Sequence, residues 1–139
     1  MGEVLVDLLL ENAIDRGMFR RKKLKEKEVR KARVKAVVDT GAVMLVLPQD
    51  LVEELGLEEL RKVVVTYADE RKEERPVAGP LSVKVGKRET TVDCVVGPPG
   101  SEALFGQIPI EAMDLIVDCS NRTIGPRPES PYLPTLKLK

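Results

Sequence analysis

The chain has 139 residues, of which 42% are hydrophobic and 3% aromatic, and its 23 basic side chains balance 23 acidic ones. This length predicts a single domain that is large enough to bury a hydrophobic core. The sequence contains no histidine, which excludes Ser-His-Asp and Cys-His catalytic pairs and histidine-ligated zinc sites. An enzyme built from it would therefore take its acid–base groups from carboxylates, lysine, tyrosine or cysteine.

Short apolar segments separated by turn signals run along most of the chain. From the N-terminus onward, these patterns predict strands at residues 4–10, 34–38, 44–47, 63–65, 81–85, 90–94 and 114–118. Short helices are predicted at 49–55, which follow a proline, and at 108–113. The last residues, 136–139, are expected to add an edge strand. Many short strands with one or two short helices favour an all-β barrel or sandwich.

A basic segment follows the first predicted strand. Residues 16–35 contain eleven Lys and Arg but only two acids, which gives this segment a net charge of +9 and leaves −9 on the rest of the chain. Such a run is typical of a solvated loop or hairpin extension. A nucleic-acid surface is the alternative, but Phe19 is the one aromatic residue nearby, and we therefore rank nucleic acid below other partners.

The cysteines and the N-terminus bear on the compartment. Cys94 and Cys119 are too few for a disulfide framework or a four-cysteine metal site, so we expect two reduced structural thiols. The first residues lack the basic region of a signal peptide, and Asp7 and Glu11 interrupt the apolar run. No apolar stretch approaches the ~20 residues of a membrane helix. These features favour a cytoplasmic protein that does not associate with membranes.

One motif stands out as a candidate for chemistry. Asp39-Thr40-Gly41-Ala42 directly follows two aliphatic residues. Because Asp and Gly are common in ordinary turns, the tripeptide alone predicts only a structural turn. Its context is more specific: an apolar run, a Leu-Pro pair and a short helix follow it, and Leu104-Phe105-Gly106 comes well downstream.

This order of motifs along the chain resembles that of the retropepsin-like aspartic proteases, and in particular of their small prokaryotic members. The resemblance covers roughly residues 3–125. It implies a closed acid-protease barrel formed by one domain over 1–139, in which each chain is half of a pepsin-like dimer. Relative to compact retroviral enzymes, residues 16–33 look like an insertion, and residues 125–139 look like a proline-rich tail.

The resemblance also implies a mechanism. Metal-free hydrolysis of a peptide bond needs one carboxylate to accept a proton from water and another to protonate the carbonyl oxygen. The chain has one Asp-Thr-Gly, so a C2 homodimer would bring two Asp39 side chains together. By similarity, the catalytic residues are Asp39, Thr40, which would brace the dimer, and Gly41, whose N–H would face the carboxylates. No metal or other cofactor is required, and the substrate is a peptide or protein.

Three further residues are candidates for binding the substrate. Ala42 stands where pepsin has serine, so the carboxylate pair has one hydroxyl donor fewer and a milder acid optimum is expected. Residues 66–79 occupy the position of the family's flap, although they are unusually charged, and Asp69 and Glu70 at its tip are candidates for substrate binding together with Ala42. Two alternatives stay open: a non-catalytic peptide- or partner-binding module on the same fold, and a nucleic-acid-associated β-barrel.

Overall fold

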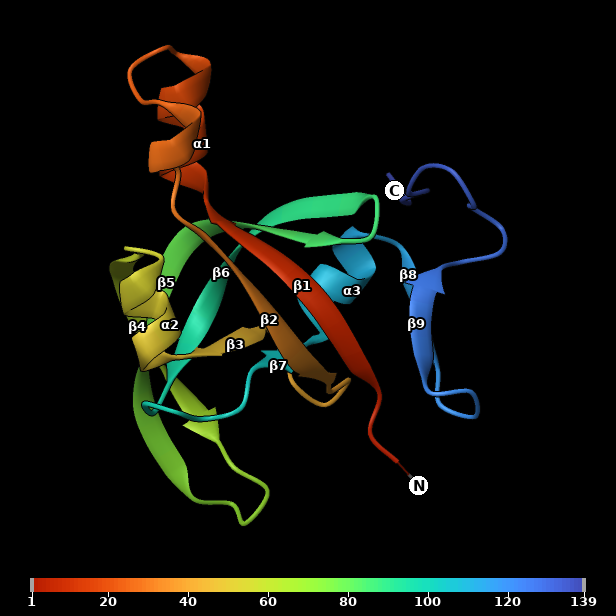
Figure 1. The fold of residues 1–139 in the computed structure, drawn as a ribbon. Coiled ribbons are helices and arrows are strands. Elements are labelled where there is room, and N and C mark those ends of the chain that lie inside the picture. Colours follow the sequence, from red (N-terminus) through yellow and green to blue (C-terminus); the bar gives the residue numbers. More distant parts are fainter. Residues whose placement is uncertain (1, 139) are drawn as a thin grey trace.

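The structure is a computed structural model that describes residues 2–138. Over this range the chain is mostly strand, with three short α-helices and one 3₁₀ turn (Figure 1). The strands are β1 (Leu5–Asn12), β2 (Lys31–Val38), β3 (Leu45–Pro48), β4 (Glu58–Thr66), β5 (Lys72–Val85), β6 (Arg88–Gly97), β7 (Leu104–Phe105), β8 (Leu115–Asp118) and β9 (Thr123–Pro126). The helices are α1 (Ala13–Arg20), η1 (Glu26–Glu28), α2 (Gln49–Glu54) and α3 (Gln107–Ala112).

Seven of the strands described form one closed sheet. Its order is β1-β2-β7-β3-β6-β5-β4, and a further pairing of β1 with β5 closes the barrel. The long strand β5 makes this closure possible because its first half pairs with β4 and its second half pairs with both β6 and β1. The expected all-β barrel is therefore confirmed.

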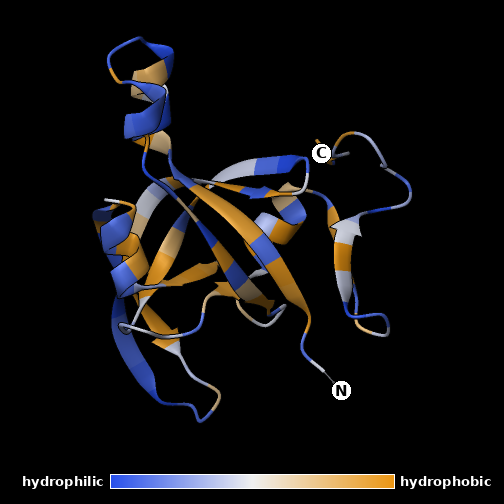
Figure 2. Ribbon diagram, viewed as in Figure 1, coloured by the Kyte–Doolittle hydropathy of each residue, from blue (hydrophilic) through white to orange (hydrophobic). Residues whose placement is uncertain are grey.

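The barrel's core follows the period-2 pattern of its strands. On β1, Val6, Leu8 and Leu10 are buried while Asp7 between them is exposed and Leu9 is half-buried, as expected for a strand with one face on the core. Figure 2 shows apolar residues gathered on the barrel strands and hydrophilic residues at the outer ends of the molecule. Phe105 on β7 is fully buried and lies next to the loop that carries the candidate catalytic motif.

The basic segment forms part of an arm, residues 13–30, that connects β1 to β2 and stands clear of the barrel (Figure 1). The arm is a hairpin extension, one of the two forms expected for the basic segment, and it begins with a helix over residues 13–20; residues 31–35 of the basic segment lie on β2. Asn12 caps helix α1 by accepting a hydrogen bond from Asp15 N at 3.0 Å. The Asp15 carboxylate in turn accepts bonds from the backbone N (3.0 Å) and Nε (2.8 Å) of Arg30, which joins the two ends of the arm.

Two further expectations about elements are corrected. Residues 2–138 contain three α-helices rather than one or two, and none of the described helices is long and apolar enough to cross a membrane. The predicted edge strand does not form over 136–138, while residue 139 lies outside the described residues. Three prolines, at 128, 131 and 134, precede this stretch, and each removes a backbone donor that a strand would use.

The two cysteines have different environments. Both are free, Cys94 buried on β6 and Cys119 exposed. Burial raises the pKa of the Cys94 thiol to about 12, so this side chain behaves as a small apolar core residue. The exposed position of Cys119 does not fit the expectation of two structural thiols.

A buried carboxylate fastens the C-terminal segment to the β8–β9 hairpin. Asp114 is buried, and its carboxylate accepts hydrogen bonds from the Arg127 side chain, from Ser130 Oγ at 2.6 Å and from Thr135 N at 2.8 Å. The Arg127 hydrogen bond, followed by those of Ser130 and Thr135, holds the pKa of Asp114 well below its usual range.

This lowered pKa predicts a pH dependence of stability. The stabilisation by ionised Asp114 is fully present above the pKa of an aspartate in the unfolded chain, ~3.9. It is lost as the pH falls toward the pKa of Asp114 in the folded protein. We expect the free energy of unfolding of the wild type to fall more steeply with decreasing pH than that of Asp114→Asn. Urea unfolding from pH 7 down to pH 2.5 measures this, and parallel curves for the two proteins would contradict it.

Candidate active site

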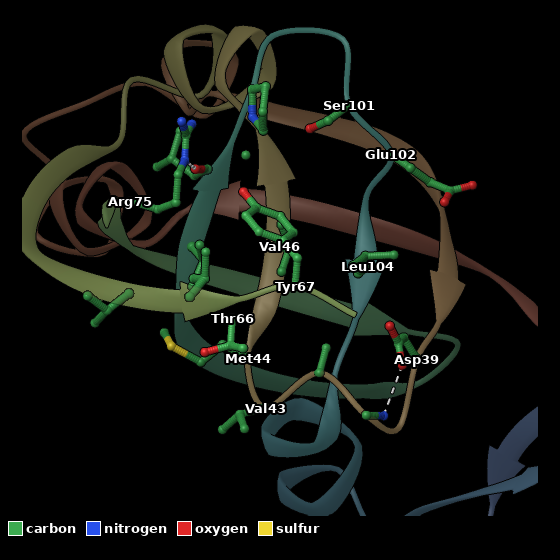
Figure 3. Close-up of a pocket in the computed structure, with 18 of the residues that line it drawn as sticks. Asp39, Val43, Met44, Val46, Thr66, Tyr67, Arg75, Ser101, Glu102 and Leu104 are labelled. Carbon is green, nitrogen blue, oxygen red and sulfur yellow. Dashed lines mark hydrogen bonds between the residues drawn. The ribbon is translucent and has the colours of Figure 1, made fainter. Parts of the chain in front are cut away.

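Asp39 lies on the loop that leaves the end of β2. Its backbone N donates to Phe105 O at 3.0 Å, and Ala42 N donates back to Asp39 O at 3.1 Å. Gly41 N donates to Asp39 Oδ1 at 2.9 Å, which is the dashed line in Figure 3. The turn thus holds one carboxylate oxygen in place, and the side chain stays half-buried.

A close crossing of two backbone segments supports this loop. Gln107 N donates to Ala42 O and Ile108 N to Val43 O, both at 2.8 Å. At the crossing point stands Gly106, where a Cβ atom would lie 2.3 Å from Met44 O and 2.7 Å from Ala42 O. The absence of a side chain at Gly106 is therefore what lets the loop rest directly on the segment after β7.

The Asp39 loop opens onto a cleft of about 820 Å³. Figure 3 shows Asp39 at one side of this cleft, with side chains from several strands around it. Most of the wall is aliphatic, and it includes Val43, Met44, Val46, Val63, Val65, Val95, Val96 and Leu104. Its size and lining fit an extended peptide segment with apolar side chains.

The hairpin of β4 and the first half of β5, residues 58–79, supplies another wall of the cleft, and we call it the flap hairpin. Thr66, Tyr67 and Ala68 line the cleft from this hairpin. Tyr67 donates its hydroxyl to Glu73 Oε1 at 3.3 Å, and the Arg71 guanidinium lies over its ring at 4.5 Å from the centroid. These contacts connect the two sides of the hairpin next to its tip.

The structure brings some of the predicted site residues together and leaves others apart. Asp39, Gly41 and Ala42 line the cleft, whereas Thr40 is exposed on the same loop and is not part of the lining. Asp69 and Glu70 lie at the tip of the flap hairpin, exposed and outside the lining. Asp69 Oδ1 accepts a hydrogen bond from Arg71 N at 3.1 Å, so it serves the turn itself.

Several cleft residues were missed by the sequence reasoning. Val63, Val65 and Tyr67 occupy alternate positions on and just after β4, and each is partly buried while its neighbours are exposed. This alternation appears in the burial alone, because the run Val63-Val64-Val65 is apolar throughout and does not distinguish the two faces of the strand. Arg75 and Glu102 also line the cleft, and no local motif marks them. Among residues 2–138, no group of three or more Asp, Glu or Cys side chains is placed to hold a metal ion.

The closed barrel and the loop geometry define a retropepsin-like aspartic protease fold, as predicted. A family model described as "gag-polyprotein putative aspartyl protease" matches residues 26–109. This match covers more than half of the chain, and the chain therefore belongs to that family. Among solved structures, EIAV protease complexed with the inhibitor HBY-793 is similar over 80% of this chain and 88% of its own, with a TM-score of 0.55 and 14% identity. At this identity the likeness concerns the fold alone. No curated protein matches the chain.

Proposed function

We propose that this protein is an aspartic endopeptidase that acts as a homodimer, with one Asp39 from each chain. The observation that carries the proposal is the position of Asp39: it lies on a hydrogen-bonded turn at the side of an aliphatic cleft, beside the flap hairpin. Membership of the aspartyl protease family supports the same conclusion. Thr40 and Gly41 complete the catalytic loop.

The proposed reaction uses the two carboxylates in opposite roles. Two carboxyl groups ~3 Å apart do not both ionise, so they share one proton. The ionised Asp39 accepts a proton from a water molecule while the water oxygen attacks the peptide carbonyl carbon. The protonated Asp39 of the other chain donates its proton to the carbonyl oxygen. Collapse of the resulting diol breaks the C–N bond, with a proton passing to the leaving nitrogen. Gly41 N–H fixes one oxygen of each carboxylate through the 2.9 Å bond.

The exposure of the catalytic loop supports a dimer. Thr40 and Gly41 are exposed and Asp39 is only half-buried, so a second copy can approach the loop. In an isologous C2 dimer each loop faces its own equivalent, and we assign Thr40 the role of bracing the opposite loop. Beyond the barrel, a set of exposed apolar side chains on β8 and the C-terminal segment offers further surface to a second copy: Ile116, Tyr132, Leu133, Leu136 and Leu138.

The experiment that tests the proposal is a comparison of wild type and Asp39→Asn on a diverse peptide pool at mildly acid to neutral pH. New peptide termini are read by mass spectrometry at high protein concentration. We expect termini that form with wild type and not with the variant. If neither protein produces termini while both bind peptides equally, the chain is instead a peptide-binding module. Binding of nucleic acid with a steep salt dependence, lost on replacing the four basic residues from Arg20 to Lys23, would favour the nucleic-acid-associated β-barrel.

The residue after Gly41 predicts the pH dependence of cleavage. Ala42 has no hydroxyl to donate to the ionised carboxylate pair, so the ionised form receives less stabilisation than with a serine at this position. We therefore expect the optimum of kcat/KM to lie in the mildly acid range. A pH profile measured on one cleaved peptide tests this, and an optimum below about pH 3 would contradict it, given an unperturbed carboxylate near 4. Ala42→Ser should move the acid limb to lower pH.

A further inference from the structure

Three charged side chains line the cleft: Asp39, Arg75 and Glu102. The proposed function uses Asp39. The charge of Arg75 is already compensated, because its Nη1 lies 3.1 Å from Glu73 Oε1 and its Nε donates to Val96 O at 2.8 Å. Arg75 is also mostly buried in this arrangement, with 19% of its side chain exposed. Neither the proposed reaction nor the contacts of Arg75 involve Glu102, the third charged side chain.

Glu102 carries an uncompensated negative charge at the rim of the cleft. Within residues 2–138, no Lys or Arg lies within ion-pair distance of its carboxylate, and it accepts no hydrogen bond from a described side chain or backbone N. Figure 3 shows Glu102 on the same side of the cleft as Asp39, with Leu104 between them. Glu102 is thus the second acidic side chain of the cleft lining, after Asp39.

The backbone on both sides of Glu102 is fixed. Before it, Gly100 N donates to Asp50 Oδ1 at 2.9 Å, which ties the loop to helix α2, and Ser101 N donates to Pro98 O at 3.1 Å. After it, Ala103 is buried and its carbonyl accepts from Val37 N at 2.9 Å. The loop therefore holds the Glu102 backbone at a fixed position relative to β2 and the Asp39 turn that follows it, while the Glu102 side chain itself is exposed.

We propose that Glu102 forms a subsite for a cationic side chain, so that this protease prefers peptide substrates with Lys or Arg near the cleaved bond. The inference rests on the proposed function. A Lys or Arg side chain suits the site chemically, because its aliphatic stem packs along apolar walls while its charged end reaches a carboxylate. Leu104, two residues after Glu102, and Val46, which pairs with Leu104 across β3 and β7, provide such a wall in the cleft lining. In the homodimer each chain contributes one Glu102, so the preference extends to both sides of the cleaved bond.

The test uses synthetic octapeptides with two central leucines and one Lys, Gln or Glu placed at each other position in turn. At the position that contacts Glu102, we expect wild type to cleave the Lys peptide with a kcat/KM at least about 10-fold above the Gln peptide, as for a charge-assisted pair, and the Glu peptide least. Glu102→Gln should remove this preference, and Glu102→Lys should invert it in favour of the Glu peptide. Glu54→Gln, which removes an exposed carboxylate outside the cleft, is the matched control and should retain the wild-type preference.

Two outcomes would overturn the inference: a wild type that cleaves the Lys, Gln and Glu peptides alike at every position, or a preference for Lys that survives in Glu102→Gln. Failure of the proposed function is a separate result, namely no Asp39-dependent cleavage of any peptide. The subsite is tested in that case as well, by fluorescence anisotropy of labelled Lys and Glu peptides on Asp39→Asn and on Asp39→Asn with Glu102→Gln. Equal binding of the two peptides by Asp39→Asn would contradict the subsite independently of turnover.

Discussion

Asp39→Asn is expected to lower kcat/KM for peptide cleavage by at least about 10³-fold, since proton transfer by positioned carboxylates contributes up to about 10⁴-fold. An amide accepts no proton from water at this position and donates none to the substrate oxygen in the way a carboxylic acid does. The Asn side chain has the same shape and keeps an oxygen that can accept the Gly41 N–H bond, which is 2.9 Å long in the wild type. The melting temperature is therefore expected to stay unchanged.

The matched control for this prediction is Asp7→Asn. Asp7 is exposed on the outside of β1 and its side chain pairs loosely with Lys35 at 3.7 Å, an exposed ion pair that contributes little stability. We expect this variant to keep wild-type kcat/KM. Steady-state kinetics on one cleaved peptide compare the three proteins. Activity of purified Asp39→Asn within a few-fold of Asp7→Asn would remove Asp39 from the chemistry.

Gly106→Ala is expected to have the largest effect on stability among the glycine substitutions. The new Cβ would meet two backbone oxygens, at 2.3 Å and 2.7 Å, and backbone cannot move aside as a flexible side chain does. Relieving the overlap requires separating the catalytic loop from the start of helix α3, which weakens the hydrogen bonds of Gln107 N and Ile108 N to that loop. We expect a loss of about 3 kcal/mol in the free energy of unfolding, the upper end of the usual range for overpacked sites.

Gly17→Ala provides a control with the opposite sign. Gly17 lies inside helix α1, and a Cβ at this position would meet nothing within 4 Å. Because glycine costs about 0.5–1 kcal/mol relative to alanine in a helix interior, this variant is expected to be stabilised by a similar amount. Urea unfolding at a fixed protein concentration measures both variants. An unchanged midpoint for Gly106→Ala would show that the crossing is not tight.

Much of the barrel could be predicted because its strands carry one apolar face each. The alternation of Val6, Leu8 and Leu10 identified β1, and the strands predicted at 81–85 and 90–94 lie on β5 and β6, which the structure separates at Gly86 and Lys87. Helix α1 was missed because its stability comes from tertiary partners: Asn12 and Asp15 bond to residues far along the chain, at Leu55 and Arg30. In sequence these residues read only as part of a charged connection.

The candidate site was predicted where the signal is local and missed where it depends on folding. Asp39 and Gly41 belong to one contiguous motif, and Gly106 to the downstream Leu104-Phe105-Gly106 motif. Asp69 and Glu70 were chosen for their place at the flap tip, but both are exposed and outside the cleft lining. Most cleft residues of the flap hairpin come from β4 and the two residues after it, with Arg75 from β5. Glu102 lies on a loop held by a hydrogen bond between Gly100 and Asp50, two residues that are 50 positions apart.

The most direct test of a dyad shared between two chains is a mixing experiment. Wild type is unfolded and refolded together with increasing amounts of Asp39→Asn, at a constant wild-type concentration, and peptide cleavage is measured. Random pairing in a C2 dimer predicts that activity falls to about one half at equal amounts and to about one tenth at a roughly ninefold excess of the variant. Activity that stays at the wild-type value throughout the titration would show that one chain is sufficient and would contradict the shared pair of Asp39 carboxylates.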